Sequence, residues 1–207
     1  MNPEEILADG IRQLGLLVEA EKQQKLMQYL GLLQKWNRTY NLTAINKVEQ
    51  MVSHHLLDSL AVLPHLQPGR WLDVGCGAGL PGLVLAIMQP NWTFELLDSN
   101  SKKCSFVQQA MIELSIKNVQ VHCVRVEEWQ QVEKFDGIIS RAFAELEKFV
   151  VTTRHLILPG GRWVAMKGAL SDVEIGQLPT DIRLERIVPL QVPGLDAARC
   201  LAILKEG

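Results

Sequence analysis

The first third of the chain carries apolar residues at helical spacing. Six positions recur at steps of three and four, which places them on one face of a helix: Leu26, Tyr29, Leu30, Leu33, Trp36 and Tyr40. A second stripe covers Val48–Leu63, with Asn46 as the expected N-cap and Glu49 as its capping-box partner. Pro64 ends this second helix. Residues 1–66 are therefore predicted to be helical.

Beyond residue 66 the hydrophobic period changes, and short apolar runs alternate with helical windows. Five runs are predicted to be strands: Arg70–Val74, Trp92–Asp98, Val119–Val124, Phe135–Ser140 and Gly161–Lys167. Three windows between them are predicted to be helices: Leu83–Met88, Lys102–Leu114 and Glu145–Leu158. Alternation of this kind indicates a parallel sheet with helices on both faces.

The end of the chain follows a different pattern. Two apolar runs, Ile182–Leu190 and Ala198–Lys205, are separated by Pro193-Gly194 with no helix between them, which predicts an antiparallel hairpin at the edge of the sheet. The fold class is therefore α/β, with a seven-stranded, mostly parallel sheet. The expected organisation is a helical cap over residues 1–66 and one domain over residues 67–207, in keeping with a length of 207 residues.

Charge and composition narrow the classes of function. Lys plus Arg total 21 and Asp plus Glu total 23, so the net charge of −2 excludes a generic basic nucleic-acid coat and leaves room only for a local basic patch. The N-terminus lacks the features of a secretory signal, and no apolar run approaches the ~20 residues of a membrane span. The four cysteines are scattered without zinc spacing. A cytoplasmic protein with free thiols, no bound metal and no membrane contact is expected.

The most informative segment is the glycine-rich stretch Asp73–Gly82, which reads DVGCGAGLPG. It follows a predicted strand and opens a predicted helix, and Pro81 suits the first helical turn. Glycine is needed where the backbone turns sharply and a ligand approaches with no side chain between. Four glycines within eight residues exceed what a turn requires, so this segment is predicted to bind a ligand.

Two cofactor classes are compatible with this segment. Gly77, Gly79 and Gly82 satisfy G-x-G-x-x-G, and Asp98 follows about 20 residues later, as a dinucleotide-binding fold requires. A carboxylate from Asp73 at the mouth of the loop would instead repel a pyrophosphate and attract an ammonium or sulfonium group. An NAD-dependent oxidoreductase thus stays an alternative, and a cofactor-binding regulatory module without catalysis is a third.

The same segment resembles the first motif of class I S-adenosylmethionine-dependent methyltransferases, Asp-x-Gly-x-Gly-x-Gly. In that superfamily an acid at the position of Asp98 binds the ribose hydroxyls. Arg125–Glu128 falls where the adenine contact is made, and Leu158–Trp163 resembles the turn before the fifth strand. The stretch Ile138–Phe143 lacks the Asn/Asp-Pro-Pro-aromatic motif of amine methylation.

The sequence offers no evident covalent nucleophile and no evident base. A target that already carries a lone pair requires neither, and guanine N7 is such a target. Orientation alone can then lower the barrier by about 7–11 kcal/mol in favourable cases.

Five blocks, the glycine segment among them, resemble one family, the bacterial GidB family of 16S rRNA guanine-N7 methyltransferases, over essentially the whole chain. These blocks are Trp36–Thr43, His54–Ser59, Asp73–Gly82, Phe135–Ala142 and Met166–Gly168. The resemblance implies that a monomeric enzyme transfers a methyl group from S-adenosylmethionine to guanine 527 of the small ribosomal subunit RNA.

The resemblance and the glycine segment together nominate site residues. The expected cofactor contacts are Asp73, Gly75, Gly77, Gly79, Leu80, Asp98, Val126, Glu127 and Arg141. No acid–base catalyst is expected, and the candidates for positioning the substrate are Arg141, Asp58 and Lys167. With Lys102 and Lys103, Arg141 and Lys167 are expected to form a small basic rim. His55, Trp36 and Tyr40 are interpreted as core residues rather than ligands, because they lie on apolar stripes.

Overall fold

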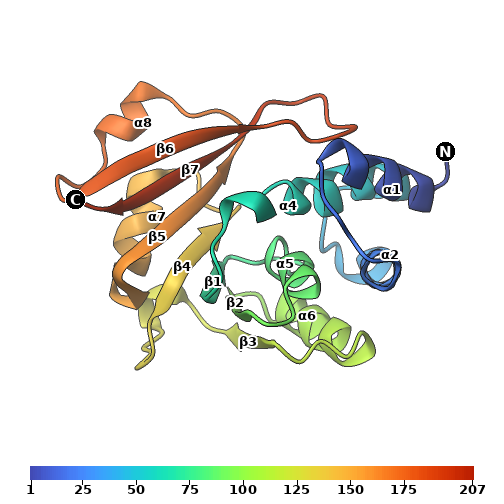
Figure 1. The fold of residues 1–207 in the computed structure, drawn as a ribbon. Coiled ribbons are helices and arrows are strands. Elements are labelled where there is room, and N and C mark those ends of the chain that lie inside the picture. Colours follow the sequence, from blue (N-terminus) through green and yellow to red (C-terminus); the bar gives the residue numbers. More distant parts are fainter.

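A seven-stranded mixed sheet runs through the molecule in the order β3-β2-β1-β4-β5-β7-β6 (Figure 1). The computed structural model describes all residues, 1–207. The strands are β1 (Arg70–Val74), β2 (Thr93–Asp98), β3 (Val119–Cys123), β4 (Phe135–Ser140), β5 (Ile157–Lys167), β6 (Ile182–Leu190) and β7 (Arg199–Glu206). Strands β1 to β5 are parallel, and β7 pairs antiparallel with both β5 and β6. The mostly parallel sheet and its terminal hairpin are confirmed.

Helices cover both faces of the sheet (Figure 1). The longer ones are α1 (Pro3–Gln13), α2 (Ala20–Tyr40), α5 (Gly82–Met88), α6 (Ser101–Glu113) and α7 (Leu146–Thr153). The shorter ones are α3 (Val48–Met51), η1 (Val52–Leu57), α4 (Asp58–Leu60), η2 (Leu63–His65), η3 (Val126–Glu128), η4 (Arg154–Leu156) and α8 (Asp172–Gly176). Helices α7 and α8 lie on one side of the sheet, and α1 to α6 lie on the other.

The second predicted helix differs in detail from the expectation. It is divided into α3, the π-helical turn η1 and α4, and a π-turn inside a helix shifts the faces that its residues present. The predicted N-cap is wrong, because Lys47 occupies that position. The side chain of Asn46 instead accepts a hydrogen bond of 2.9 Å from Nδ2 of the buried Asn37. A tertiary partner therefore takes the oxygen that the local pattern assigned to the helix end.

Two other boundaries also move. Helix α7 ends at Thr153 and passes through η4 into β5, which begins at Ile157, four residues before the predicted start. Ile157 pairs with Phe135 of β4 ahead of a bulge, so the strand continues upstream of Gly161. Pro81 lies immediately before α5 rather than in its first turn.

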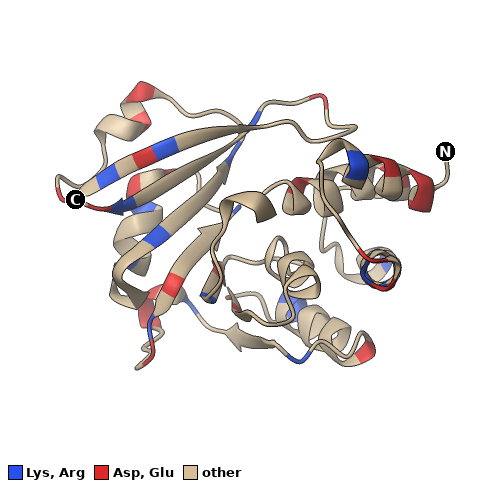
Figure 2. Cartoon of the chain, viewed as in Figure 1, with Lys and Arg blue, Asp and Glu red and all other residues tan.

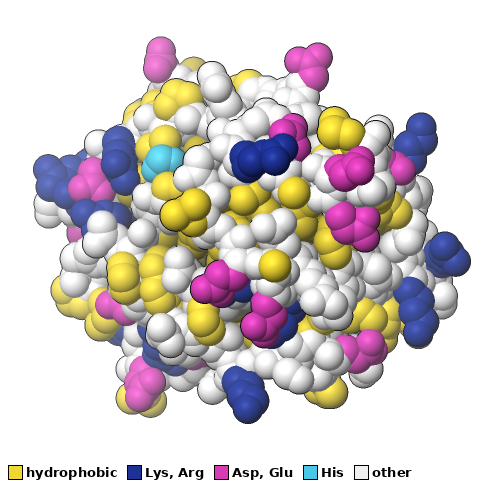
Figure 3. Space-filling view, turned by 45° about the vertical axis from the view of Figure 1, so that its right-hand side comes forward, with side chains coloured by type: hydrophobic (Ala, Val, Ile, Leu, Met, Phe, Trp, Pro, Cys, Tyr) yellow, Lys and Arg dark blue, Asp and Glu magenta, His cyan; other side chains and the backbone are white.

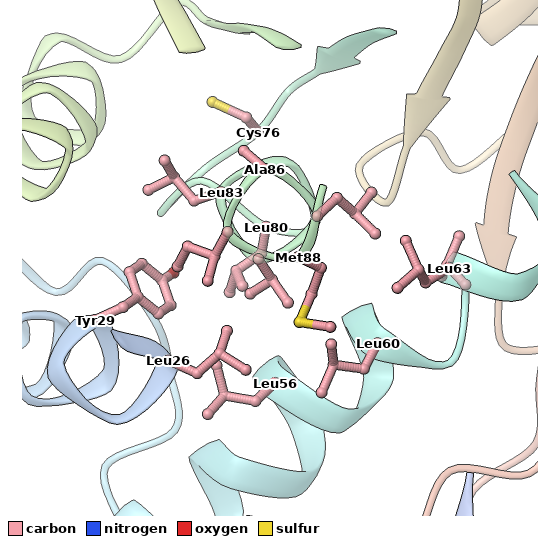
Figure 4. Packing of buried hydrophobic residues seen from close by; sticks show 14 of the residues in the cluster. Leu26, Tyr29, Leu56, Leu60, Leu63, Cys76, Leu80, Leu83, Ala86 and Met88 are labelled. Carbon is pink, nitrogen blue, oxygen red and sulfur yellow. The ribbon is translucent and has the colours of Figure 1, made fainter. Parts of the chain in front are cut away.

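The helical N-terminus and the α/β part share one hydrophobic core. Helix α5 is buried at all seven positions, the pattern of a helix surrounded by protein. Figure 4 shows it between α2, which contributes Leu26 and Tyr29, and the η1–α4 segment, which contributes Leu56 and Leu60. The face of α5 away from the sheet is thus covered by residues 1–66.

The end of the apolar stripe on α2 is only partly buried. Trp36 packs its ring 5.7 Å from that of the buried Phe106 on α6, which confirms its packing role. The ring of Tyr40 lies 5.2 Å from that of Trp36 but is 42% exposed. The interpretation of Tyr40 as a core residue is wrong, because the helix runs past the edge of the core before it ends.

One buried hydrogen bond ties the helical N-terminus to the glycine segment. The hydroxyl of Tyr29 donates to the carbonyl oxygen of Ala78 at 2.8 Å, and the ring is fully buried. Burial raises the pKa of this phenol well above its usual range, so it stays a neutral donor.

Replacing Tyr29 by phenylalanine should lower the free energy of unfolding by about 1–3 kcal/mol, because the Ala78 carbonyl is left buried and unpaired. Urea denaturation measures this change. Tyr40→Phe is the matched control, since its exposed hydroxyl makes no hydrogen bond within the chain, and a change below about 0.5 kcal/mol is expected there. Equal effects of the two substitutions would contradict the assignment.

Candidate active site

The glycine segment connects β1 to α5 at the carboxyl-terminal edge of the sheet, where ligands bind in open α/β folds. Gly75, Gly77 and Gly79 have φ angles of +71°, +58° and +85°, which L-residues with side chains adopt only under strain. The amides of Gly75 and Cys76 both donate to the carbonyl of Leu97, at 2.8 and 3.1 Å. These bonds hold the loop against the end of β2.

Asp73 lies beneath this loop rather than at its mouth. Its carboxylate is fully buried, and Oδ2 accepts a 2.8 Å hydrogen bond from the amide of Gly82 at the start of α5. Burial raises the pKa of this carboxyl to about 7, although the Gly82 amide and the charge of Arg141 act in the opposite direction. The expected position of Asp73 at the ligand is therefore corrected: it braces the loop from below.

Asp98 occupies the position that the sequence predicts for it, at the end of β2 beside the loop. Its Oδ2 accepts from the amide of Gly77 at 2.9 Å, and its Oδ1 accepts from the amide of Asn100 at 2.8 Å. The side chain is held rigidly and still borders a cavity of about 450 Å³. Each carboxylate oxygen has a second lone pair, so both can accept a further hydrogen bond from a ligand.

This first cavity combines an apolar surface with a few polar groups. Leu97, Val124, Val126 and Phe143 supply the apolar part, and Asp98 and Glu127 stand among them. Val126 opens the short helix η3 after β3 and is buried, while Glu127 is exposed. Such a lining suits a flat, mostly apolar ring attached to a polar sugar.

A second cavity of about 180 Å³ lies on the other side of the loop. Its walls come from the loop itself, from Leu80, from Thr43 and His55 of the helical N-terminus, and from Lys103 and Arg141. The two cavities adjoin at Gly75 and Ala142, which line both. A β-carbon placed on Gly75 would lie 2.7 Å from Cβ of Ala142, so only glycine keeps this junction open.

Arg141 follows β4 and is anchored toward the helical N-terminus. Its Nη1 donates to the carbonyl of His54 and to Oδ2 of Asp58, both at 3.1 Å. The other oxygen of Asp58 accepts from Nε of Arg199 at 3.2 Å. Asp58 is only 1% exposed, so it can position a substrate only through the arginines that it holds. Arg199 has no local motif in the sequence, and only the fold brings it to Asp58 from 141 residues away.

Lys167 is also placed differently from the expectation. Its Nζ donates to the carbonyl of Ala144 and, at 2.7 Å, to Oε1 of Glu174. A lysine paired in this way adds no free positive charge to a basic rim, and its role in positioning a substrate stays a prediction. Lys103 borders the second cavity, and Lys102 is exposed beside it in the first turn of α6. The basic rim is therefore reduced to Arg141, Lys102 and Lys103.

His55 is buried, as expected of a core residue, but it also borders the second cavity. Its Nε2 lies 3.0 Å from Oγ1 of Thr43. Burial, helped by the nearby charge of Arg141, lowers the pKa of the imidazole to about 4. The ring is therefore neutral at physiological pH.

This shift makes a pH-dependent prediction. The folded pKa of about 4 lies below the ordinary value of 6.5, so the unfolded chain binds the proton first. His55 should therefore destabilise the fold progressively as the pH falls from 6.5 to 4. His55→Gln removes this effect. The free energy of unfolding of the variant minus that of the parent protein should therefore be about 3 kcal/mol larger at pH 4 than at pH 7. Urea denaturation at a series of pH values measures the difference, and a pH-independent difference would contradict it.

Comparison with known proteins identifies the family of the chain. A family profile described as GidB, rRNA small subunit methyltransferase G, matches residues 22–202. The chain belongs to this family. Two relatives named ribosomal RNA small subunit methyltransferase G support the assignment. The one from Laribacter hongkongensis is 50% identical over 204 residues, which cover 99% of each chain. The one from Neisseria meningitidis serogroup A is 48% identical over 207 residues, the whole of both chains.

Solved structures show the same fold at low sequence identity. The N-methyltransferase NodS of Bradyrhizobium japonicum, in complex with S-adenosyl-L-homocysteine, gives a TM-score of 0.59 at 15% identity, covering 84% of this chain and 98% of that one. An S-adenosylmethionine-dependent methyltransferase of Aquifex aeolicus gives 0.57 at 20% identity, covering 72% and 90%.

Family and fold together make the chain an S-adenosylmethionine-dependent methyltransferase of class I, as expected. They do not support the oxidoreductase alternative.

None of the helices combines the length and the apolar character that a bilayer crossing demands.

Proposed function

We propose that this protein transfers a methyl group from S-adenosylmethionine to N7 of a guanine in 16S rRNA, the nucleotide that the family resemblance identifies as guanine 527. One observation carries this proposal. Relatives named ribosomal RNA small subunit methyltransferase G align over nearly the whole chain and are identical to it at about half of the aligned positions. A ribosomal RNA substrate implies that the enzyme works in the cytoplasm.

The residues around the two cavities fit the cofactor in one orientation. The adenosine end suits the first cavity, where Asp98 accepts from the ribose hydroxyls and Val126 and Glu127 flank the ring. The amino-acid end suits the second, smaller cavity, where Leu80 supplies apolar contact and the guanidinium of Arg141 can bind a carboxylate. This orientation would bring the reactive centre to the junction of the cavities.

The bare backbone of the loop supports this orientation. Gly75 and Gly77 line the second cavity without a side chain, and Asp73 holds the loop from beneath. Gly79 lines neither cavity, and a β-carbon there would meet Leu83 at 2.6 Å. When bound, S-adenosylmethionine supplies a methyl group activated by a sulfonium centre.

The side chains near the junction favour orientation over covalent or acid–base catalysis. Cys76 is buried, and burial raises the pKa of its thiol well above the usual range, so it does not provide a thiolate. His55 is neutral and engaged with Thr43. Guanine N7 carries an unprotonated lone pair, so the protein has only to align it with the methyl group.

We infer that residues 1–66 act as a cap on the substrate side of a catalytic domain formed by residues 67–207. The cap supplies Thr43 and His55 to the second cavity and Asp58 to Arg141. Both parts contribute to one cofactor site within a single chain, which supports a monomer as the active form.

The charge distribution suits recognition of a single site rather than general RNA binding. Acidic and basic side chains are interspersed over the surface in Figure 3, and β6 alternates basic, acidic and basic segments in Figure 2. Non-specific RNA affinity rises with the number of phosphates that basic residues neutralise. A net charge of −2 therefore favours a substrate defined by its folded shape.

The test is methylation of small ribosomal subunits from cells that lack the modification. Purified protein and methyl-labelled S-adenosylmethionine should label one guanine at a position that borohydride and aniline cleave, as they do at 7-methylguanine. Subunits that already carry the modification are the control and should accept no label. Absence of label, or label at an atom other than N7, would reject the proposal. S-adenosylmethionine binding without turnover would instead favour a regulatory module.

A further inference from the structure

A buried carboxylate joins two arginines at the edge of the candidate active site. Oδ2 of Asp58 lies 3.1 Å from Nη1 of Arg141, and Oδ1 lies 3.2 Å from Nε of Arg199. The three residues come from α4, from the loop after β4 and from the start of β7. Burying a charged carboxylate is costly unless it is paired and hydrogen-bonded, so Asp58 favours keeping both arginines beside it.

The sheet register places Arg199 on the side where the cavities open. Cys200 of β7 pairs with Lys167 at the end of β5, so β7 begins where the parallel strands end. Arg141 directly follows β4 at the same edge. Arg141 borders the second cavity, whereas Arg199 borders neither cavity. The two guanidinium groups are therefore linked through Asp58, but only Arg141 belongs to the cofactor site.

Two guanidinium groups on one carboxylate leave a net positive charge with unused donors. The side chains of Arg141 and Arg199 are 30% and 28% exposed. Nη1 of Arg199 donates to the carbonyl of Ala198 at 2.9 Å, while Nη2 makes no hydrogen bond. A guanidinium group already fixed by a carboxylate loses little further freedom when it binds a phosphate, whose oxygens match its planar donors.

From this juxtaposition we propose that Arg199 binds a backbone phosphate of the RNA beside the target nucleotide, and that Asp58 is a positioning residue that sets its place relative to Arg141. The inference rests on the proposed function, since an RNA substrate supplies the phosphate. It assigns the C-terminal hairpin a role in substrate binding, whereas the glycine segment and β2 serve the cofactor.

The experiment compares Arg199→Ala with Arg183→Ala in the full-length protein, with unmodified small subunits as substrate. Arg183 is an exposed arginine of the same hairpin that makes no ion pair and lies at the opposite end of the strands, beside Lys205. Both variants remove one positive charge. Arg199→Ala should raise the KM for the subunit about tenfold and reduce the slope of log affinity against log salt by about one, the effect of one lost phosphate contact. Arg183→Ala should change neither quantity.

Calorimetric titration with S-adenosylmethionine checks that the folded site survives in each variant, and its Kd should stay unchanged. Arg199→Gln is a second test, because its amide can still donate to Asp58 without the charge, and the same losses are expected. A Gln variant with the parent KM and salt slope would overturn the proposal.

Asp58→Asn tests the positioning role. It retains both arginine charges, so the KM for the subunit should rise while the salt slope stays unchanged. A purely structural Asp58 would lower the melting temperature and leave that KM unaltered, and this result would remove the positioning role.

The methylation activity of the parent protein distinguishes failure of this inference from failure of the proposed function. If the parent enzyme methylates guanine N7 but the Arg199 variants behave as Arg183→Ala does, only the phosphate contact is rejected. If the parent enzyme methylates no RNA, the proposed function fails, and the premise of an RNA phosphate fails with it.

Discussion

Replacing Asp98 by alanine is expected to weaken S-adenosylmethionine binding by about 100-fold. A hydrogen bond to a charged group contributes about 1.5–3 kcal/mol, and the carboxylate is placed to accept two from a ribose diol, so a loss of about 3 kcal/mol corresponds to two orders of magnitude. The loss is reinforced locally, because the amides of Gly77 and Asn100 also lose their acceptor. Isothermal titration calorimetry measures the affinity, and circular dichroism verifies that the fold is retained.

Glu127→Ala is the matched control for this substitution. Glu127 borders the same cavity and carries the same charge, but its side chain is exposed and makes no hydrogen bond within the chain. If this position contacts the adenine ring through its backbone amide, truncating the side chain should change the affinity less than about threefold. Equal losses in the two variants would show that the charge of the cavity, rather than the geometry of Asp98, determines binding.

The second large effect is expected at the junction of the two cavities. Gly75→Ala should reduce kcat/KM by at least about 100-fold, because a displacement near 1 Å at the reacting centre has effects of that size. The new β-carbon would lie 2.7 Å from Cβ of Ala142, and the φ of +71° adds backbone strain. Either the loop or the segment after β4 must move, and both border the two cavities. Steady-state methylation of unmodified small subunits measures the effect.

Gly77→Ala separates the clash from the strain. Gly77 has a comparable φ of +58°, but a β-carbon there would meet no atom within 4 Å. It should therefore show only the cost of a left-handed alanine, about 1–2 kcal/mol in unfolding free energy, with a much smaller loss of kcat/KM. The double variant Gly75→Ala/Ala142→Gly should recover part of the lost activity. If Gly75→Ala and Gly77→Ala lost activity equally, the clash between residues 75 and 142 would not be the cause of the loss.

The hydrophobic pattern was sufficient to predict the sheet. The bounds of β1 and β4 agree with the predicted ones, because a strand buried on both faces appears as a short apolar run between polar turns. The bounds of the edge strand β6 agree as well. The glycine segment could also be predicted from the sequence, because positive φ angles and close approach of the backbone both require glycine at the position itself. The position of Asp98 also follows from local sequence, because the residue ends a strand at a fixed distance from the loop.

The errors fall where a residue's partner lies outside its own helix or strand. Asn46 bonds to Asn37 instead of capping a helix, and Lys167 is neutralised by Glu174. Asp58 is buried between two arginines rather than facing substrate. No local pattern distinguishes a carboxylate that meets water from one that meets a guanidinium group.

The local sequence therefore specifies the elements, the loop and the chemistry that the loop can hold, because helix, strand and turn preferences act between near neighbours. The division of the site into two adjoining cavities, the burial of Asp73 and the link from Asp58 to Arg199 depend on how the cap and the hairpin pack on the sheet. These features arise from contacts between segments as many as 141 residues apart, which form only when the chain is folded.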